Sequence, residues 1–189
     1  MDVSAAAVSP DRAMLQTMDA VVTPLRLRPG DLVRLISPAS PPNEVGVAEA
    51  RSVLESWGLR VDLGENVFTR YGYLAGTDEQ RLADFNAALR DPEVRAIVAT
   101  RGGKGSYRIA DRLDFWAARA DPKFFVGISD NTALHLSLFR HCRQVGLHGA
   151  LYADPVSGRV SNTTISALRG ALTGTWNTIA SGPTSRRRS

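Results

Sequence analysis

Cysteine is almost absent from this sequence of 189 residues, since Cys142 is the single one. One cysteine excludes an internal disulfide and fits a reducing compartment. Cys142 lies in a stretch with helical spacing, where we expect a buried, unreactive thiol and not a nucleophile. Long apolar runs are missing as well, and none approaches the length that spans a bilayer. The first 19 residues lack the basic start and long apolar core of a signal peptide, so we expect a cytoplasmic protein.

Basic charge and metal-binding patterns are also scarce. The net charge is +4, but Arg186, Arg187 and Arg188 supply three of these charges. Because no stripe of Arg and Lys is interleaved with aromatic residues, we expect no nucleic-acid partner. No cluster of His, Cys, Asp and Glu has the spacing of metal ligands, so we expect no metal and no cofactor.

What is present predicts one compact domain. With 43% hydrophobic and 22% charged residues, the chain is long enough for a single domain with its own core. Residues 1–26 have no clear periodicity and predict a mobile extension. The domain itself is predicted at residues 27–155. Residues 156–189 predict one short helix followed by a disordered, Arg-rich tail.

The domain alternates between strand and helix patterns. Short apolar runs predict strands at residues 32–36, 59–67, 94–100, 123–128 and 147–153. Helical spacing of apolar residues predicts helices at residues 44–57, 77–90, 107–120 and 130–142. In the second of these helices, Thr77 and Gln80 form a capping box. This alternation predicts an α/β fold, with a mainly parallel sheet covered by helices on both faces.

Two unusual loops follow strands of this sheet, "TRGGKGS" at residues 100–106 and "GISDN" at residues 127–131. Both are expected at the carboxyl edge of the sheet, where sites form in such folds. Ser129 and Asp130 have two interpretations. They can cap the following helix, or Ser129 can be a nucleophile on a tight elbow, although Asn131 breaks the G-x-S-x-G pattern of known elbows.

The glycine loop matches neither a phosphate loop nor a dinucleotide fingerprint, because its glycines are Gly102, Gly103 and Gly105. Its exposed amides could form an oxyanion hole, or the loop could be a simple tight turn. Three histidines are available as a base for Ser129. His135 and His141 lie on the helix that follows the turn, where His135 cannot easily fold back onto Ser129. His148 lies at the start of a later predicted strand and could be near in space.

Several of these segments together resemble the LD-carboxypeptidase family of serine peptidases, which includes the microcin C resistance peptidases. They are "GDLVRLISPASP", "GYLAGTDEQRLADFNAALRDPEVRAIVATRGGKGSYRI", "LDFWAARADPKFFVGISDNTALHLSL" and "GLHGALY", in the family's order. The resemblance covers about residues 28–155. It implies that Ser129 is the nucleophile and that the amides of Asp130 and of Gly102 or Gly103 form the oxyanion hole. Lys104 stands where family members often have an aromatic residue.

Length is the main departure from the family. The resemblance implies a Glu and a His from a second, C-terminal domain. Here no glutamate follows Glu93, and the last histidine, His148, matches the family's structural H-G motif. We therefore expect a truncated form, or a piece of a longer protein, that carries the nucleophile alone and is barely active by itself.

Two functional classes stay open at this point. The first is a carboxypeptidase, or the nucleophile-bearing half of one, acting on murein-derived peptides or related peptide-nucleotides. The second is a non-catalytic domain that binds a peptide or a partner. The surface that a second domain would cover suggests a possible homodimer.

Overall fold

The computed structural model describes residues 20–151 and 160–174 of the chain. The expected tail and most of the expected N-terminal extension lie outside these ranges. The first half of the domain runs from strand to helix as the apolar pattern predicts. Its elements are β1 (Leu32–Ile36), α2 (Glu44–Ser56), β2 (Arg60–Leu63), α3 (Asp78–Arg90) and β3 (Val94–Ala99).

The second half continues the alternation with shorter elements, and α6 provides the short helix expected after residue 155. The elements are three 3-10 turns, η1 (Ser106–Arg108), η2 (Ala110–Arg112) and η3 (Ser129–Asn131), the helices α4 (Phe115–Ala120), α5 (Thr132–Cys142) and α6 (Asn162–Thr173), and the strands β4 (Phe124–Gly127) and β5 (Leu147–His148).

Within the described residues the sheet has five strands, all parallel, in the order β2-β1-β3-β4-β5. The chain builds β2 on one side of β1 and then crosses over to β3 on the other side. Such a reversal opens a crevice between the loops that leave the two central strands, and ligands bind there in open α/β sheets. The loops after β1, β3 and β4 therefore share one edge.

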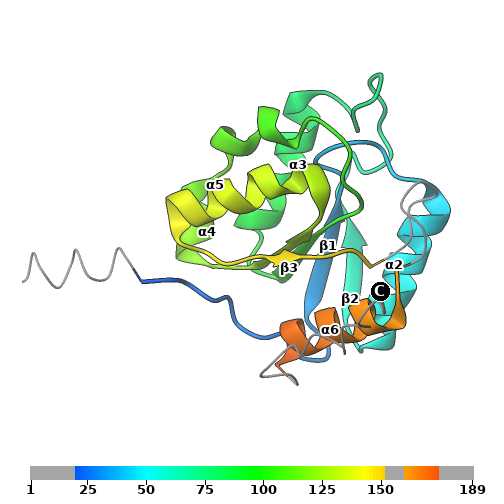
Figure 1. Cartoon of the computed structure of the whole chain (residues 1–189). Coiled ribbons are helices and arrows are strands. Elements are labelled where there is room, and N and C mark those ends of the chain that lie inside the picture. Colours follow the sequence, from blue (N-terminus) through cyan, green and yellow to red (C-terminus); the bar gives the residue numbers. More distant parts are fainter. Residues whose placement is uncertain (1–19, 152–159, 175–189) are drawn as a thin grey trace, which may run out of the picture.

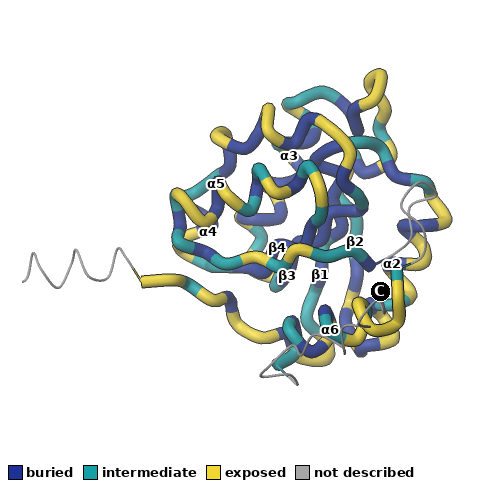
Figure 2. Tube along the Cα trace, in the orientation of Figure 1, coloured by how far each residue is buried: buried dark blue, intermediate teal, exposed yellow. Residues whose placement is uncertain are grey.

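Helices cover both faces of the sheet, which confirms the fold class expected from the sequence. Figure 1 shows α3, α4 and α5 on one side of the strands and α2 and α6 on the other. Figure 2 shows the strands buried between these layers, while exposed positions gather on helix surfaces and loops. Alternate residues of β3 serve opposite cores: Ala96 and Val98 face α2, whereas Ile97 and Ala99 face α3 and α5.

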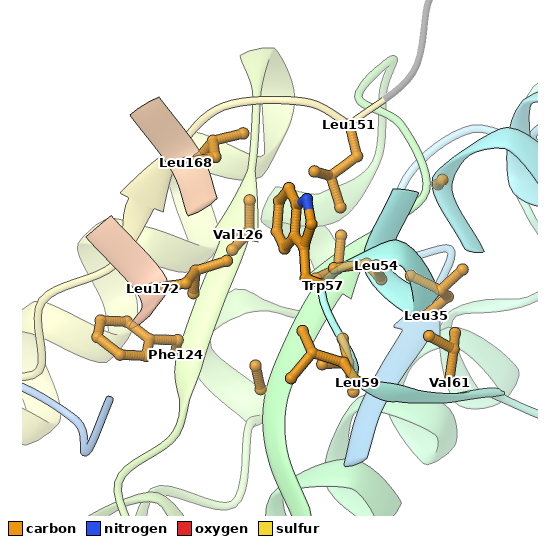
Figure 3. Packing of buried hydrophobic residues seen from close by; sticks show 14 of the residues in the cluster. Leu35, Leu54, Trp57, Leu59, Val61, Phe124, Val126, Leu151, Leu168 and Leu172 are labelled. Carbon is orange, nitrogen blue, oxygen red and sulfur yellow. The ribbon is translucent and has the colours of Figure 1, made fainter. Parts of the chain in front are cut away.

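The core beneath α2 and α6 is built around Trp57, which is 8% exposed. Figure 3 shows its indole among leucine side chains, including Leu151, Leu54 of α2 and Leu168 of α6. Leu168 and Leu172 bury one stripe of α6 in this core. The core therefore includes a helix from beyond residue 155, where the expected domain ended.

The core on the opposite face joins α3, α4 and α5 to the sheet. The rings of Phe85 and Phe125 lie 5.1 Å apart between their centroids, a spacing typical of favourable aromatic pairs. Cys142 is buried in this core, and burial raises the pKa of its thiol. The thiol is therefore protonated and unreactive, as the sequence predicted.

The expected single helix over residues 107–120 is wrong. The structure has η1 and η2, an extended Leu113 and then the short α4. The Asp114 carboxylate accepts a hydrogen bond from the Ala117 amide (3.0 Å) and forms an ion pair with Arg90 on α3. The Asp114 amide donates to Asn86 Oδ1, also on α3. These contacts with α3 end one helical segment and start another.

Residues 20–26, which the sequence assigned to an extension, lie along the domain. Val22 forms a parallel bridge with Gln144 beyond α5, and the Arg26 side chain donates to the Gly174 carbonyl at the end of α6 (3.3 Å). In the described part of the chain, no helix has both the length and the apolar character needed to cross a membrane.

Candidate active site

Ser129 has the backbone of an elbow. It follows β4 directly, and its φ of 57° lies in the left-handed region that non-glycine residues rarely adopt. The following helix, α5, begins at Thr132 and has no side-chain cap. The Ser129 hydroxyl makes no hydrogen bond within the described residues, and the residue is exposed. The geometry is that of an elbow presenting a hydroxyl, and not that of a helix cap.

Gly102 brings the glycine loop against this elbow. A Cβ atom at Gly102 would lie 2.8 Å from the Ser129 Cβ and 2.9 Å from the Ile128 carbonyl oxygen. Real side chains do not approach so closely, so only glycine allows the loop to lie here. The absence of a side chain at Gly102 places its backbone within reach of whatever binds at the Ser129 hydroxyl.

Gly103 turns the loop at a φ of 118°, and a Cβ there would overlap the Ser40 side chain. Ser40 lies in the loop after β1 and holds the glycine loop at two points. Its amide donates to the Gly102 carbonyl (3.3 Å), and its hydroxyl accepts from the Lys104 amide (3.2 Å). No described group accepts a hydrogen bond from the amides of Gly102 and Gly103, which leaves both amides available to a ligand.

The two residues after Ser129 tie the elbow to the glycine loop. Asp130 accepts from the Ser106 amide at 2.7 Å through its carboxylate, and from the Ser106 hydroxyl through its carbonyl. The buried Asn131 side chain donates to the Arg101 carbonyl (3.1 Å). The Asp130 amide belongs to the first turn of a helical segment, where amides lack intrahelical partners.

Arg81 on α3 connects the loop after β1 with the loop after β3 through hydrogen bonds. Its side chain is fully buried, and one nitrogen, Nη1, donates to the carbonyls of Pro38 (2.6 Å) and Gly105 (2.8 Å). Its other terminal nitrogen pairs with Asp78, which also binds Arg108. Burial lowers the pKa of Arg81 and Asp78 opposes this shift. One buried cation therefore connects the loop after β1 with the loop after β3.

The three histidines have different positions. His148, at the end of β5, accepts a hydrogen bond from the Ser129 amide at its Nε2 (3.2 Å). His135 bonds the Gly127 carbonyl through its Nε2 (3.1 Å), and burial lowers its pKa. His141 stacks on Phe115 at the far end of α5. Two histidines thus lie beside the elbow, and neither has a hydrogen bond with the Ser129 hydroxyl among the described residues.

The structure brings together the four residues that the sequence singled out, namely Ser129, Asp130, Gly102 and Gly103. The sequence reasoning missed the contributions of Ser40, Arg81, Ser106 and Asn131. Their contacts join segments far apart in the chain, so spacing along the sequence could not reveal them. An arginine on the apolar side of an amphipathic helix was the one available signal for Arg81.

Other kinds of site find no support in the described part of the chain. It holds no group of three His, Cys, Asp or Glu side chains that could bind a metal ion. Two hollows lie at the opposite edge of the sheet, next to α6, with Arg28 and Thr173 in the walls of both. Neither hollow includes a residue of the elbow or of the glycine loop. Within the described residues, the elbow and the glycine loop therefore remain the candidate site.

Comparisons with known proteins place this geometry in a family. Residues 33–149 match the model of the LD-carboxypeptidase N-terminal domain. The probable murein peptide carboxypeptidase of Bacillus subtilis is 41% identical over 133 residues, which cover 70% of this chain and 42% of that protein. A crystal structure of an MccF-like protein from Bacillus anthracis is 28% identical with a TM-score of 0.74, covering 81% of this chain and 47% of that one.

A structure of MccF in complex with glutamyl sulfamoyl guanosine is 25% identical, with a TM-score of 0.71, and covers 79% of this chain and 46% of that one. The chain thus spans a little less than half the length of these relatives. The match includes β1, the glycine loop, the elbow and β5. The chain belongs to the LD-carboxypeptidase family, whose N-terminal domain it carries.

Proposed function

We propose that this chain is the nucleophile-bearing part of a serine carboxypeptidase that cleaves the amide bond between an L- and a D-amino acid. The substrate class is a murein-derived peptide in the cytoplasm. The observation that carries the proposal is Ser129, an exposed serine at a φ of 57° directly against Gly102. The name of the Bacillus subtilis relative, a probable murein peptide carboxypeptidase, supports the substrate class.

The proposed reaction uses three groups, namely a nucleophile, a base and an oxyanion hole. The Ser129 oxygen attacks the carbonyl carbon of the scissile amide while a base removes the hydroxyl proton. Negative charge develops on the carbonyl oxygen and is stabilised by the amides of Asp130 and of Gly102 or Gly103. The proton then passes to the leaving amine of the D-amino acid. Water hydrolyses the resulting acyl-enzyme ester and restores the serine.

The base must come from outside the described residues. Family resemblance implies a Glu and a His from a C-terminal domain, and this sequence has no glutamate after Glu93. We propose that further polypeptide, in the same protein or a separate one, supplies both residues. The loss of a single member of a serine triad removes several orders of magnitude in rate. We therefore expect the chain alone to hydrolyse tetrapeptides barely or not at all.

A second function is favoured by one observation. Within the described residues, both histidines next to the elbow are occupied by backbone groups. A domain of this kind can bind a peptide without cleaving it. A related peptide-nucleotide is also a suitable ligand, because MccF has been solved with glutamyl sulfamoyl guanosine.

Complementation tests the proposal. The chain is mixed with a polypeptide made from the second half of the Bacillus subtilis relative, and release of D-alanine from murein tetrapeptide is measured. We expect hydrolysis by the mixture that disappears with Ser129→Ala. Ser137→Ala, on the buried side of α5, is the matched control and should leave hydrolysis in place. Peptide binding by calorimetry without hydrolysis in any mixture would favour the non-catalytic function.

A further inference from the structure

Two imidazole rings hold the backbone on either side of Ile128, just before the elbow. His135 on α5 contacts the Gly127 carbonyl (3.1 Å), and His148 on β5 contacts the Ser129 amide (3.2 Å). The centroids of the two rings lie 6.3 Å apart. Both contacts use Nε2, but a carbonyl only accepts a hydrogen bond and an amide only donates one. The two histidines must therefore be in opposite states.

His135 carries its hydrogen on Nε2, because the Gly127 carbonyl cannot donate. Its Nδ1 faces Gly146, where a Cβ atom would overlap the ring. His135 is half-buried, and burial lowers its pKa; the Gly127 carbonyl opposes this shift, and His148 adds to it to a smaller extent. Burial thus favours the neutral ring, and the carbonyl partner fixes its hydrogen on Nε2.

His148 needs the opposite tautomer. To accept from the Ser129 amide, its Nε2 must present a lone pair, so the hydrogen of the neutral ring is on Nδ1. A base for Ser129 would need this same lone pair for the hydroxyl proton. One lone pair cannot serve both groups, so the contact with the amide takes His148 out of the role of base.

We propose that His148 is a positioning residue, which fixes the left-handed backbone at Ser129 by accepting its amide hydrogen. The role in catalysis rests on the proposed function, because Ser129 needs to be positioned only if it is a nucleophile. The hydrogen bond and the tautomer do not rest on it. A left-handed serine is strained and persists only where its surroundings enforce that conformation. His148 supplies such a constraint from the neighbouring strand.

The tautomer and the hydrogen bond can be measured on the full chain by ¹⁵N NMR. In the neutral ring we expect a pyridine-like Nε2 and a pyrrole-like Nδ1 for His148, with the reverse for His135. We also expect a scalar coupling between the Ser129 amide nitrogen and His148 Nε2, since a coupling across a hydrogen bond requires direct contact. A hydrogen on His148 Nε2, or no coupling in the neutral ring, would overturn the proposal.

Variants separate positioning from packing. His148→Gln places an amide oxygen close to where Nε2 lies and should keep the hydrogen bond. The Ser129 amide proton should therefore keep the downfield chemical shift of a hydrogen-bonded amide. His148→Leu removes the acceptor, so this proton should move upfield and exchange faster. His141→Gln, at the far end of α5, is the control and should change neither. If His148→Leu leaves the Ser129 amide unchanged, the proposal is wrong. If His148→Leu does not fold, the coupling in the natural chain still decides.

These measurements require no catalysis and so separate two kinds of failure. If complementation yields no hydrolysis while the coupling is present, the proposed function fails and the contact of His148 stands. If hydrolysis occurs without the coupling, His148 does not position Ser129 and the nucleophile is held by other contacts.

Discussion

Each residue of the Ser129–Asn131 turn has a separate structural task. Ser129 presents its hydroxyl at a left-handed φ, Asp130 accepts from Ser106, and Asn131 donates to the Arg101 carbonyl. Small polar residues at this point first suggest a helix cap. None of the three side chains caps α5 in the structure. Their polar groups instead join the elbow to the glycine loop.

The strain at Ser129 leads to a prediction about stability. A left-handed conformation costs a non-glycine residue about 1–2 kcal/mol, so Ser129→Gly should leave the free energy of unfolding unchanged or raise it. Ser129→Ala removes no capping hydrogen bond and should change it by less than about 0.5 kcal/mol. Urea denaturation of both variants measures these values. Losses above about 1 kcal/mol in both would instead identify Ser129 as a cap.

At the scale of elements, α3 controls the loops of the site through Arg81. Removing this buried cation would leave the carbonyls of Pro38 and Gly105 without a donor. We expect Arg81→Met to lower the free energy of unfolding by about 2–6 kcal/mol, because each of the two buried carbonyls left without a donor costs about 1–3 kcal/mol. Arg112→Met removes an exposed pair with Glu79 (3.6 Å) and is the control.

Arg112→Met should cost less than about 1 kcal/mol. Chemical denaturation of the two variants gives both values. Equal effects of the two substitutions would show that Arg81 does not brace the loops.

Asp84 on α3 gives a prediction about pH. It is 5% exposed and binds the Asn66 backbone and side chain (2.9 and 2.8 Å), and burial raises its pKa. The folded chain therefore takes up a proton at Asp84 more readily than the unfolded chain. Its contribution to stability grows as the pH falls through the raised pKa, and levels off below the ordinary pKa of about 4.

Asp84→Asn removes this titration. The stability of the natural chain relative to the variant should therefore increase when the pH is lowered from neutrality toward 4. Thermal unfolding of both proteins across this range measures the difference. If the stability of the natural chain relative to the variant stays constant, or decreases as the pH is lowered, the burial of Asp84 does not raise its pKa.

Comparison of elements shows where sequence reasoning works. Strand β1 and helix α3 were predicted closely, because a short apolar run and a capping box are local signals. The helix expected over residues 107–120 failed because contacts of Asp114 with α3 are not local. The hydrogen bonds of Arg81 with the loops and the contact of His148 with Ser129 could not be predicted either, because each joins segments that are far apart in the sequence.

At the scale of the whole molecule, two exposed tyrosines lie near Arg108, which follows the glycine loop. They are Tyr73 (58% exposed) and Tyr107 (61% exposed), and both add to the rise in the pKa of Arg108 that Asp78 mainly causes. Arg108 in turn pairs with Asp78, the partner of Arg81. Grouped aromatic surface of this kind favours association with a partner. It is a suitable surface for the polypeptide that is proposed to complete the site.

We predict that the chain alone forms dimers or soluble aggregates through this aromatic surface. The double variant Tyr73→Ser with Tyr107→Ser should shift sedimentation toward the monomer. Trp116→Ser, on the outer side of α4 where the indole is 79% exposed, is the matched control and should leave association unchanged. A clean monomer of the natural chain at high concentration would contradict the prediction.

The central claim is that Ser129 is a nucleophile whose base lies outside the described residues. The most direct test is the release of D-alanine from murein tetrapeptide by the rigorously purified chain alone, with Ser129→Ala and His148→Gln measured beside it. We predict no release above that of Ser129→Ala, because a neutral serine hydroxyl without a base is a poor nucleophile. Turnover comparable to that of a full-length relative, lost in His148→Gln, would contradict the account and identify His148 as the base.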